Sequence, residues 1–215
     1  ALHCARRRER RGLMAGLRAL VVYCHPSGDS FAAAVRDRVL DRLAAAGAEV
    51  RLTDLYAEDF DPVLSAAEWQ GYANAPANRA AVDRHCADLL WCDTLIFVYP
   101  TWWYGLPAML KGWLDRVLLP GIAFHLPEGD GGAIRPGLRH IRRLGTFTTC
   151  GASRWLSWLS GQPGRRQLQR GIGWLCAPFH RRAFAAHYRM DAATPESRRR
   201  HLARVAAQTD RLIRR

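Results

Sequence analysis

The sequence lacks any apolar run that approaches the roughly 20 residues needed to cross a bilayer. We therefore expect a soluble protein with no stable membrane insertion. The stretch from Leu17 to Cys24 follows an arginine run, as the apolar part of a signal peptide would. It leads into His25-Pro26 and a charged segment, without a small-residue cleavage site. We interpret it as a buried strand.

Cysteines are few and widely spaced, which excludes zinc-binding and thioredoxin patterns. The chain has 215 residues, of which 49% are hydrophobic, so one sizeable core needs no disulfide framework. These features predict a single domain, no metal site and a reducing cytoplasmic location. The six cysteines stand at positions 4, 24, 86, 92, 150 and 176.

Acidic residues are outnumbered, with 19 Asp and Glu against 32 Lys and Arg, and the net charge is +13. The two ends hold +9 of this charge, because residues 1–13 carry +4 and residues 194–215 carry +5. Aromatic residues in the body lie in apolar runs and do not alternate with arginine. We therefore predict no nucleic-acid partner, although anionic ligands such as phosphates remain favoured.

The chain does not open with methionine, and Met14 immediately precedes the first expected strand. Residues 1–13 are therefore expected to be a disordered extension or an upstream misreading of the start. We expect one domain over residues 14–215. The mass of the native protein tests the misreading, which a mass including all thirteen residues would reject.

Strands and helices are expected to alternate along the chain, which predicts an α/β fold with a doubly wound parallel sheet. Residues 54–77 and 120–137 are expected to be irregular loops, the second rich in glycine and proline. Helices are expected to begin near residues 31, 82, 107 and 194. The expected strands are residues 19–24, 49–53, 95–99, 143–149 and 182–190.

The most informative stretch, residues 99–113, joins the apolar strand 95–99 to a helix through an aromatic loop. Pro100 is expected to end the strand, Gly105 to allow unusual backbone torsions, and Pro107 to lie in the first helical turn. Ligands of open α/β sheets lie beyond the carboxyl ends of strands, where residues 101–105 would fall. A buried aromatic cluster is an equally good interpretation of these residues alone.

The loop after the first strand leads into a helix that begins near Phe31, and its composition favours an anion. Free amides at a helix start attract phosphate, and His25, Ser27 and Ser30 add donors. The loop has neither the glycines of a dinucleotide fingerprint nor the Gly-Lys-Ser of an ATP-binding loop. The alternative is that Asp29 or Ser30 only caps the helix.

Loops after the first, third and fourth strands emerge at one edge of a doubly wound sheet. A phosphate at residues 27–31 and a flat ring between residues 101–105 and 148–151 would together form a flavin site. The ring would stack on Trp103 or Tyr104. For Thr148 and Thr149, simple β-propensity at a strand end is the alternative.

Three motifs resemble those of the flavodoxin-like NAD(P)H:quinone oxidoreductases and their bacterial NAD(P)H-dependent oxidoreductase relatives. His25 with Ser30-Phe31 resembles the His-x-x-x-x-Ser-Phe loop for flavin phosphate. Residues 100–113 are similar to the Pro-x-x-Trp-Phe/Tyr-Gly-x-Pro-Ala-x-Leu-Lys-Gly-Trp segment, which is the most specific of the three. Residues 148–151 resemble the Thr-Thr-Gly-Gly turn. The likeness extends from about residue 17 to 203 and is weak around 155–180.

The resemblance implies a five-stranded sheet of order 2-1-3-4-5, FAD or alternatively FMN as cofactor, NAD(P)H as substrate, and a homodimer. It places Trp103 and Phe124 on the substrate side of the flavin. The cofactor residues it implies, together with those derived above, are His25, Ser27, Ser30, Phe31, Pro100, Thr101, Trp102, Trp103, Tyr104, Gly105, Thr148, Thr149, Cys150 and Gly151.

Three departures from the family pattern bear on the site. Ala32 stands where members often have asparagine, and Cys150 replaces the first glycine of the Thr-Thr-Gly-Gly turn. Trp155 and Leu156 lie in the region where some members carry a tyrosine and a histidine that assist proton movement. His85 and His140 have no partnered serine in the pattern, so we assign no catalytic side chain.

The expected reaction is transfer of a hydride from NAD(P)H to flavin N5, followed by passage of two electrons to a quinone or similar acceptor. A flavin-binding regulatory subunit of a potassium-efflux transporter is the alternative, since the superfamily also resembles such proteins. Turnover of NAD(P)H with a simple quinone separates the two. A one-electron flavodoxin carrier is disfavoured by the positive charge, because such carriers are usually acidic.

Overall fold

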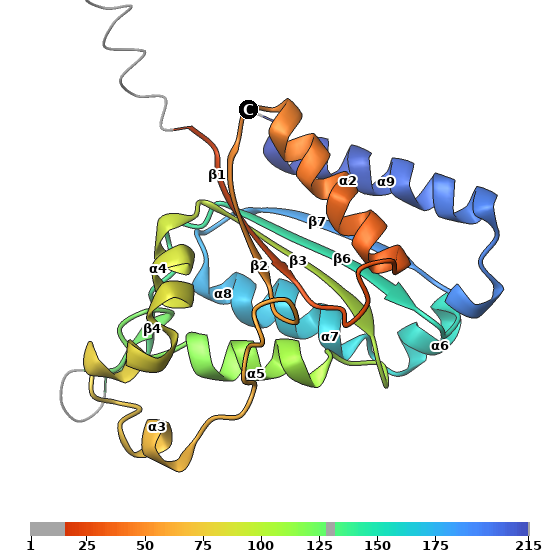
Figure 1. Ribbon diagram of the computed structural model, residues 1–215. Coiled ribbons are helices and arrows are strands. Elements are labelled where there is room, and N and C mark those ends of the chain that lie inside the picture. The colour runs from red at the N-terminus through yellow and green to blue at the C-terminus, as the bar shows by residue number, and fades with distance from the viewer. Residues whose placement is uncertain (1–15, 128–131, 215) are drawn as a thin grey trace, which may run out of the picture.

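The computed structural model describes residues 16–127 and 132–214, and these form a parallel sheet covered by helices on both faces (Figure 1). The sheet order is β2-β1-β3-β6-β7, with every neighbouring pair parallel. Numbered among themselves, the five strands have the order 2-1-3-4-5, which confirms the predicted fold. Their bounds are β1 (Arg18–Tyr23), β2 (Glu49–Asp54), β3 (Thr94–Thr101), β6 (Arg143–Cys150) and β7 (Arg181–His187).

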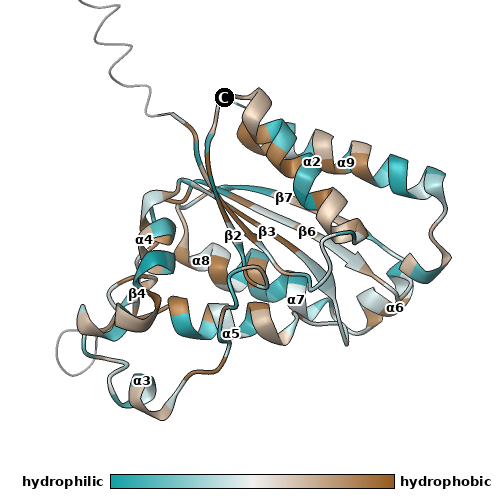
Figure 2. Cartoon of the chain, in the orientation of Figure 1, coloured by the Kyte–Doolittle hydropathy of each residue, from teal (hydrophilic) through white to brown (hydrophobic). Residues whose placement is uncertain are grey.

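The helices α2 and α9 cover one face of the sheet, and the remaining long helices cover the other (Figure 1). Alternation along β1 separates two hydrophobic clusters, because Leu20 and Val22 face one layer while Ala19 and Val21 face the other. The middle of the sheet is accordingly apolar, whereas α9 carries polar residues along its length (Figure 2). The helices of these two layers are α2 (Phe31–Ala45), α4 (Asp83–Trp91), α5 (Ala108–Val117), α6 (Arg154–Leu159), α7 (Pro163–Arg166), α8 (Gly173–Leu175) and α9 (Pro195–Ile213), with the π-helical turn η2 (Gln167–Ile172).

Two segments expected to be irregular contain short elements. Within residues 54–77, α3 (Ala66–Gln70) is held by a capping box in which Ser65 and Glu68 bond each other's backbone amides, and η1 (Ala77–Val82) follows. Within residues 120–137, β4 (Phe124–His125) pairs with β5 (Arg135–Pro136). The helix α3 was not expected because it depends on side-chain hydrogen bonds of its cap, which the pattern of hydrophobic residues does not reveal.

Pro100 does not end the central strand, contrary to the expectation from sequence. β3 continues to Thr101, and Pro100 is paired in register with Thr149 of β6. On the other side β1 has already ended, since its last paired residue, Tyr23, lies opposite Val98. The missing N–H of Pro100 therefore interrupts no ladder on that side.

Other boundaries shift by a few residues. β7 ends at His187, and the turn η3 (Met190–Ala192) takes the remainder of the strand expected to reach residue 190. Pro107 is the residue before the first turn of α5, with extended ψ of 145°, and does not lie within that turn. The expectations for residues 1–13 and for Met14 fall outside the described residues.

The described cysteines are Cys24, Cys86, Cys92, Cys150 and Cys176, and all five are free and buried. Burial raises the pKa of Cys86 to about 11 and that of Cys24 to about 12, so these thiols stay protonated. Within residues 16–127 and 132–214, no helix is long and apolar enough to span a membrane.

Candidate functional site

A cleft of about 1050 Å³ lies at the carboxyl ends of β1, β3 and β6. This volume is slightly above the range of about 300 to 1,000 Å³ that is usual for small-molecule sites. Many of the residues that the sequence predicted for cofactor binding line it together, although they come from three separate loops. These lining residues are His25, Phe31, Pro100, Thr101, Trp102, Trp103, Tyr104, Thr149, Cys150 and Gly151.

The aromatic loop after β3 is open and does not fill the cleft. Trp103 is 97% exposed, and Trp102 and Tyr104 are more than one third exposed. The tryptophan of this stretch that packs in the core is Trp113 on α5, which is fully buried. The interpretation of residues 101–105 as a buried aromatic cluster is therefore wrong.

The unusual backbone torsions of this loop belong to Trp103 and Tyr104, not to Gly105. Their φ values are 48° and 62°, in the left-handed region that large side chains rarely adopt. The N–H of Gly105 donates to the carbonyl of Trp102 at 2.9 Å, which closes the turn. Strain of this kind is held where the surrounding structure requires it, often at binding sites.

The start of α2 presents two unpaired amides to the cleft. Ser30 is the N-cap, and its hydroxyl accepts from the N–H of Ala33 at 3.1 Å. Among the described residues, no partner is present for the N–H groups of Phe31 and Ala32, and both residues line the cleft. Ser30 thus serves as the cap, and an anion would be bound by the next two amides.

His25 lines the same cleft and lies beside Trp102, with ring centroids 6.4 Å apart. Its Nδ1 lies 3.0 Å from the backbone nitrogen and 3.1 Å from the carbonyl oxygen of Ser27, so these contacts hold the ring through Nδ1 and leave Nε2 free of them. The hydroxyl of Ser27 accepts from the N–H of Asp29. Ser27 and Ser30 shape the loop, and neither lines the cleft.

Replacing Phe31 by proline tests the anion-binding amides. Proline fits the first helical position, and Ser30 before it already has the extended backbone that proline requires, with ψ of 159°. Phe31→Ala is the matched control, because it removes the same ring and keeps the N–H. We expect the dissociation constant for a phosphate-bearing flavin to be about tenfold higher for Phe31→Pro than for Phe31→Ala. If a fluorescence titration gives equal affinities for the two variants, the N–H of Phe31 does not bind the phosphate.

The carboxyl end of β6 forms the wall opposite the aromatic loop. The hydroxyls of Thr148 and Thr101 are 2.8 Å apart, so Thr148 braces the loop from behind the cleft and does not line it. Cys150 is 95% buried, and its Sγ lies 3.6 Å from the hydroxyl of Ser157. A Cβ at Gly151 would lie 3.2 Å from a carboxylate oxygen of Asp191. The cleft is therefore narrow at Gly151, which is the one glycine of the Thr-Thr-Gly-Gly turn that this chain retains.

Four further residues line the cleft that the sequence did not predict as ligands: Ala32, Ala152, Met190 and Asp191. Met190 and Asp191 belong to η3, which follows β7. The fifth strand ends at the same edge of the sheet as the other four, so its loop was a candidate on topology alone. Asp191 places a carboxylate at the cleft.

Gly105 and Phe124 are predicted site residues that do not line the cleft. Gly105 closes the turn described above. Phe124 lies on β4 and is partly buried against the hydrophobic cluster that contains Trp113. The structure of one chain therefore does not bring Phe124 to the other predicted residues.

Two other histidines are satisfied within the fold. The Nε1–H of Trp113 donates to Nδ1 of His85 at 3.3 Å, and Nε2 of His140 donates to the carbonyl of Leu89 at 3.1 Å. Neither has a serine partner among the described residues.

Two buried histidines support Phe31 from behind. The ring of Phe31 lies 5.4 Å from His187 and 5.9 Å from His201 between centroids. Burial lowers the pKa of His201 to about 4, and the neighbouring His187 and Arg204 act in the same direction. Burial also lowers the pKa of His187. Both rings are therefore neutral at neutral pH.

Acid should weaken this support and the fold with it. An unfolded histidine binds its proton near pH 6.5, so below that pH the unfolded chain binds more protons than the folded one. The stability due to His201 is complete above about pH 6.5 and is lost as the pH falls toward 4. Between about pH 7 and pH 5 we expect it to account for on the order of 1 to 2 kcal/mol of the free energy of unfolding. Urea denaturation measures the free energy of unfolding at both pH values. Between about pH 7 and pH 5 it should fall less for His201→Leu than for the wild type, and an equal fall in both proteins would contradict the role of His201.

The sequence matches a known family over almost the whole described chain. The family described as flavodoxin-like fold matches residues 18–209. The chain belongs to this family.

Relatives of known name are oxidoreductases. An uncharacterized NAD(P)H oxidoreductase of Haemophilus influenzae is 34% identical over 135 residues, which cover 62% of this chain and 64% of that protein. The human ribosyldihydronicotinamide dehydrogenase (quinone) is 32% identical over 130 residues, covering 53% and 56%. The chain therefore matches less than two thirds of the length of these relatives.

Solved structures agree over a larger part of the chain. Smu.1420 from Streptococcus mutans superposes with a TM-score of 0.77 at 28% identity, covering 91% of this chain and all of that one. An NAD(P)H:quinone oxidoreductase from Methanothermobacter marburgensis has a TM-score of 0.75 at 24% identity, covering 91% and 98%, which shows a common fold.

Proposed function

We propose that the protein is a flavin-dependent NAD(P)H oxidoreductase that reduces a quinone or a related two-electron acceptor. The observation that carries the proposal is the composition of the cleft, in which two unpaired helix amides and an open aromatic loop face one space. The names of the relatives support an oxidoreductase and favour it over the regulatory subunit considered from sequence.

The residues present fit a flavin. The amides of Phe31 and Ala32 have no partner among the described residues, and together with the ring of His25 they suit a phosphate. The loop at residues 101–104 and the turn at residues 149–151 leave space for a flat ring between them. Ala32 lacks the side-chain amide of the asparagine that family members often have at this position. Its backbone N–H still supplies a hydrogen-bond donor at the phosphate end of the site.

A bound flavin would supply the redox chemistry, accepting a hydride at N5 from NAD(P)H and passing two electrons to the acceptor. The chain's own residues bind and orient it. Thr149 and Gly151 form one wall, Trp102 and Tyr104 form the other, and the fully exposed Trp103 leaves the outer side of the cleft accessible to substrates. No side-chain nucleophile is required.

FAD is the proposed cofactor, with FMN as the alternative. A homodimer is part of the proposal because Phe124 does not reach the cleft of its own chain, and a second copy is the available route to a substrate-side aromatic residue there. A cytoplasmic location is proposed from the unpaired state of the five described cysteines.

Steady-state oxidation of NADH and NADPH with a simple quinone tests the activity. We expect turnover with a ping-pong pattern, in which double-reciprocal plots at several quinone concentrations are parallel, because both substrates use the same open face in turn. A protein that binds flavin but does not oxidise NADH or NADPH with a quinone would contradict the proposed enzymatic activity and favour a regulatory role.

A further inference from the structure

The outer edge of β7 has no strand beside it among the described residues, and a groove runs along it, exposed at Arg182 and buried at Ala186. β7 is the last strand in the sheet order, so among the described residues its only strand partner is β6. The N–H of Arg181 donates to the carbonyl of Arg142, so alternate residues from Arg181 face β6. In a parallel ladder the residues between them, Arg182, Phe184 and Ala186, turn their N–H and C=O groups outward.

Two adjoining pockets, of about 1020 and 490 Å³, lie along this edge. They share Trp158, Gln162, Arg165 and Phe184, so they form one groove. Residues of α6 and α7 line one side of it, and Arg204 of α9 lies on the other. The edge of the sheet, and not one of its faces, therefore forms the floor.

The groove is basic and has no acidic lining residue among those described. None of its arginines forms an ion pair within the described chain. Trp158, which is 69% exposed, and Phe184, on whose ring the guanidinium of Arg165 lies at 4.3 Å, add apolar surface. The arginines are Arg154, Arg165, Arg166, Arg170, Arg182 and Arg204.

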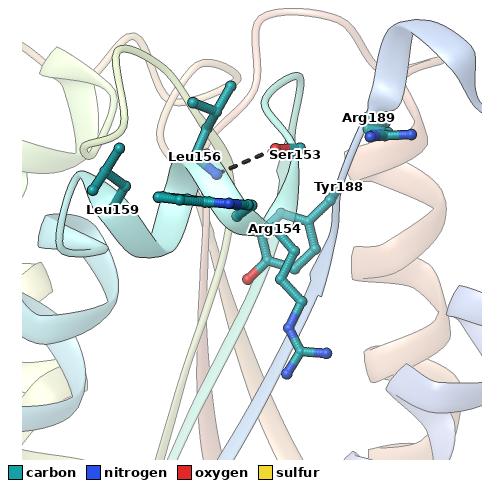
Figure 3. Close-up of a pocket in the computed structure, with 7 residues that line it drawn as sticks. Ser153, Arg154, Leu156, Leu159, Tyr188 and Arg189 are labelled. Carbon is teal, nitrogen blue, oxygen red and sulfur yellow. Dashed lines mark hydrogen bonds between the residues drawn. The ribbon is translucent and has the colours of Figure 1, made fainter.

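The groove continues past the end of β7 into a third pocket of about 520 Å³ (Figure 3). There Leu156 and Leu159 of α6 and Tyr188 face the same space, and the side chain of Arg154 runs past the ring of Tyr188. Burial raises the pKa of Tyr188, while Arg165, Arg154 and Arg204 oppose this shift, as expected where three guanidinium groups surround one hydroxyl. Arg189 adds a further cation at this end.

We propose that the open edge of β7 and its arginine-lined groove bind an extended acidic segment of a partner protein, which adds to the sheet as a sixth strand. Main-chain bonds to the outward groups of β7 hold the segment. Successive side chains of a strand point to opposite faces, so carboxylates on neighbouring residues reach the arginines on both sides. A strand of seven residues allows contact over about 23 Å.

Two other occupants fit less well. A second copy of this chain in a two-fold contact would place the same arginines against each other, and the whole chain carries +13. A single-stranded nucleic acid would satisfy the arginines and the tryptophans, but its backbone has no counterpart to the alternating donors and acceptors of a strand edge.

Fluorescence anisotropy with labelled synthetic peptides tests the proposal. The probe is a peptide in which pairs of glutamates alternate with pairs of valines, as long as β7, so that glutamates face both sides of the strand. One control replaces every glutamate by lysine. A second control methylates the backbone nitrogen of every valine, which removes main-chain donors and leaves the charge unchanged. We expect the parent peptide to bind at least about tenfold more tightly than either control.

Variants then locate the site. Arg170 and Arg204 are exposed, lie outside the flavin cleft, and flank the groove from opposite faces of the sheet. Arg170→Glu/Arg204→Glu should weaken peptide binding at least about tenfold, whereas Arg79→Glu on η1, far along the chain from the groove, should change it less than about twofold. Unchanged melting temperature shows that the variants are folded. Hydrogen exchange should slow at Arg182, Phe184 and Ala186 when the peptide binds.

Several results would overturn the proposal. No binding of the parent peptide, or equal binding of its N-methylated form, would exclude strand addition. Tighter binding of a single-stranded RNA of equal charge would assign the groove to nucleic acid. A dimer in sedimentation that dissociates only in the Arg170→Glu/Arg204→Glu variant would show that a second copy covers this edge.

Discussion

Gly112→Ala should destabilise the protein by about 3 kcal/mol, although alanine is the better helix former. Gly112 lies on α5, where the helix crosses the chain at Pro62. A Cβ at this position would lie 2.2 Å from the carbonyl oxygen and 2.5 Å from the Cα of Pro62, so backbone must move to admit it. The melting temperature should fall by roughly 6 to 12 °C.

Gly171→Ala is the control for this substitution. Gly171 also lies in a helical segment, η2, but nothing lies within 4 Å of the Cβ that it would gain. Its substitution should leave the melting temperature unchanged or raise it slightly, because glycine costs helical segments entropy. Equal melting temperatures of the two variants would mean that α5 does not pack on Pro62 as described.

Gly151→Phe should reduce flavin affinity at least about 100-fold, which corresponds to about 2.7 kcal/mol. Gly151 and Asp191 face each other across the narrow part of the cleft, so a phenyl ring at Gly151 would occupy the space between the aromatic loop and the end of β6. Quenching of flavin fluorescence on titration with the apoprotein measures the affinity.

Gly151→Ala serves as the matched control for the effect of size. Its added methyl group meets only the carboxylate end of Asp191, at 3.2 Å, and that side chain is exposed and can rotate away. The alanine variant should lose less than about fivefold in affinity. If the phenylalanine variant binds flavin as tightly as the wild type while its melting temperature is unchanged, the ring does not lie between these walls.

Much of the sheet could be predicted from the sequence because its signals are local and strong. The buried strand before Pro100 has a continuous apolar run, and Gly47, with φ of 69°, lies just after the end of α2, where glycine is the usual residue. The strand order depended on the resemblance and on the alternation of strands with helices. The strand β3 can continue through Pro100 because β1 ends before it reaches this residue. Where β1 ends relative to β3 depends on how the two strands pair, which neither stretch of sequence reveals alone.

The limits of sequence reasoning at the site have similar physical causes. Glycine is the usual residue for left-handed torsions, so Gly105 was the natural candidate, whereas the structure gives those torsions to Trp103 and Tyr104. Asp191 was missed because it lies about forty residues beyond the Thr-Thr motif and meets the cleft only when β7 is placed beside β6. Phe124 was proposed from resemblance alone, and no single-chain contact supports it.

The release of a flavin from the purified protein is the most direct test of the central claim that the cleft at the carboxyl ends of β1, β3 and β6 binds this cofactor. The account predicts a visible flavin absorption spectrum, or its recovery on addition of FAD or FMN, and a mass that identifies which of the two is bound. A colourless protein that neither flavin reconstitutes would contradict it.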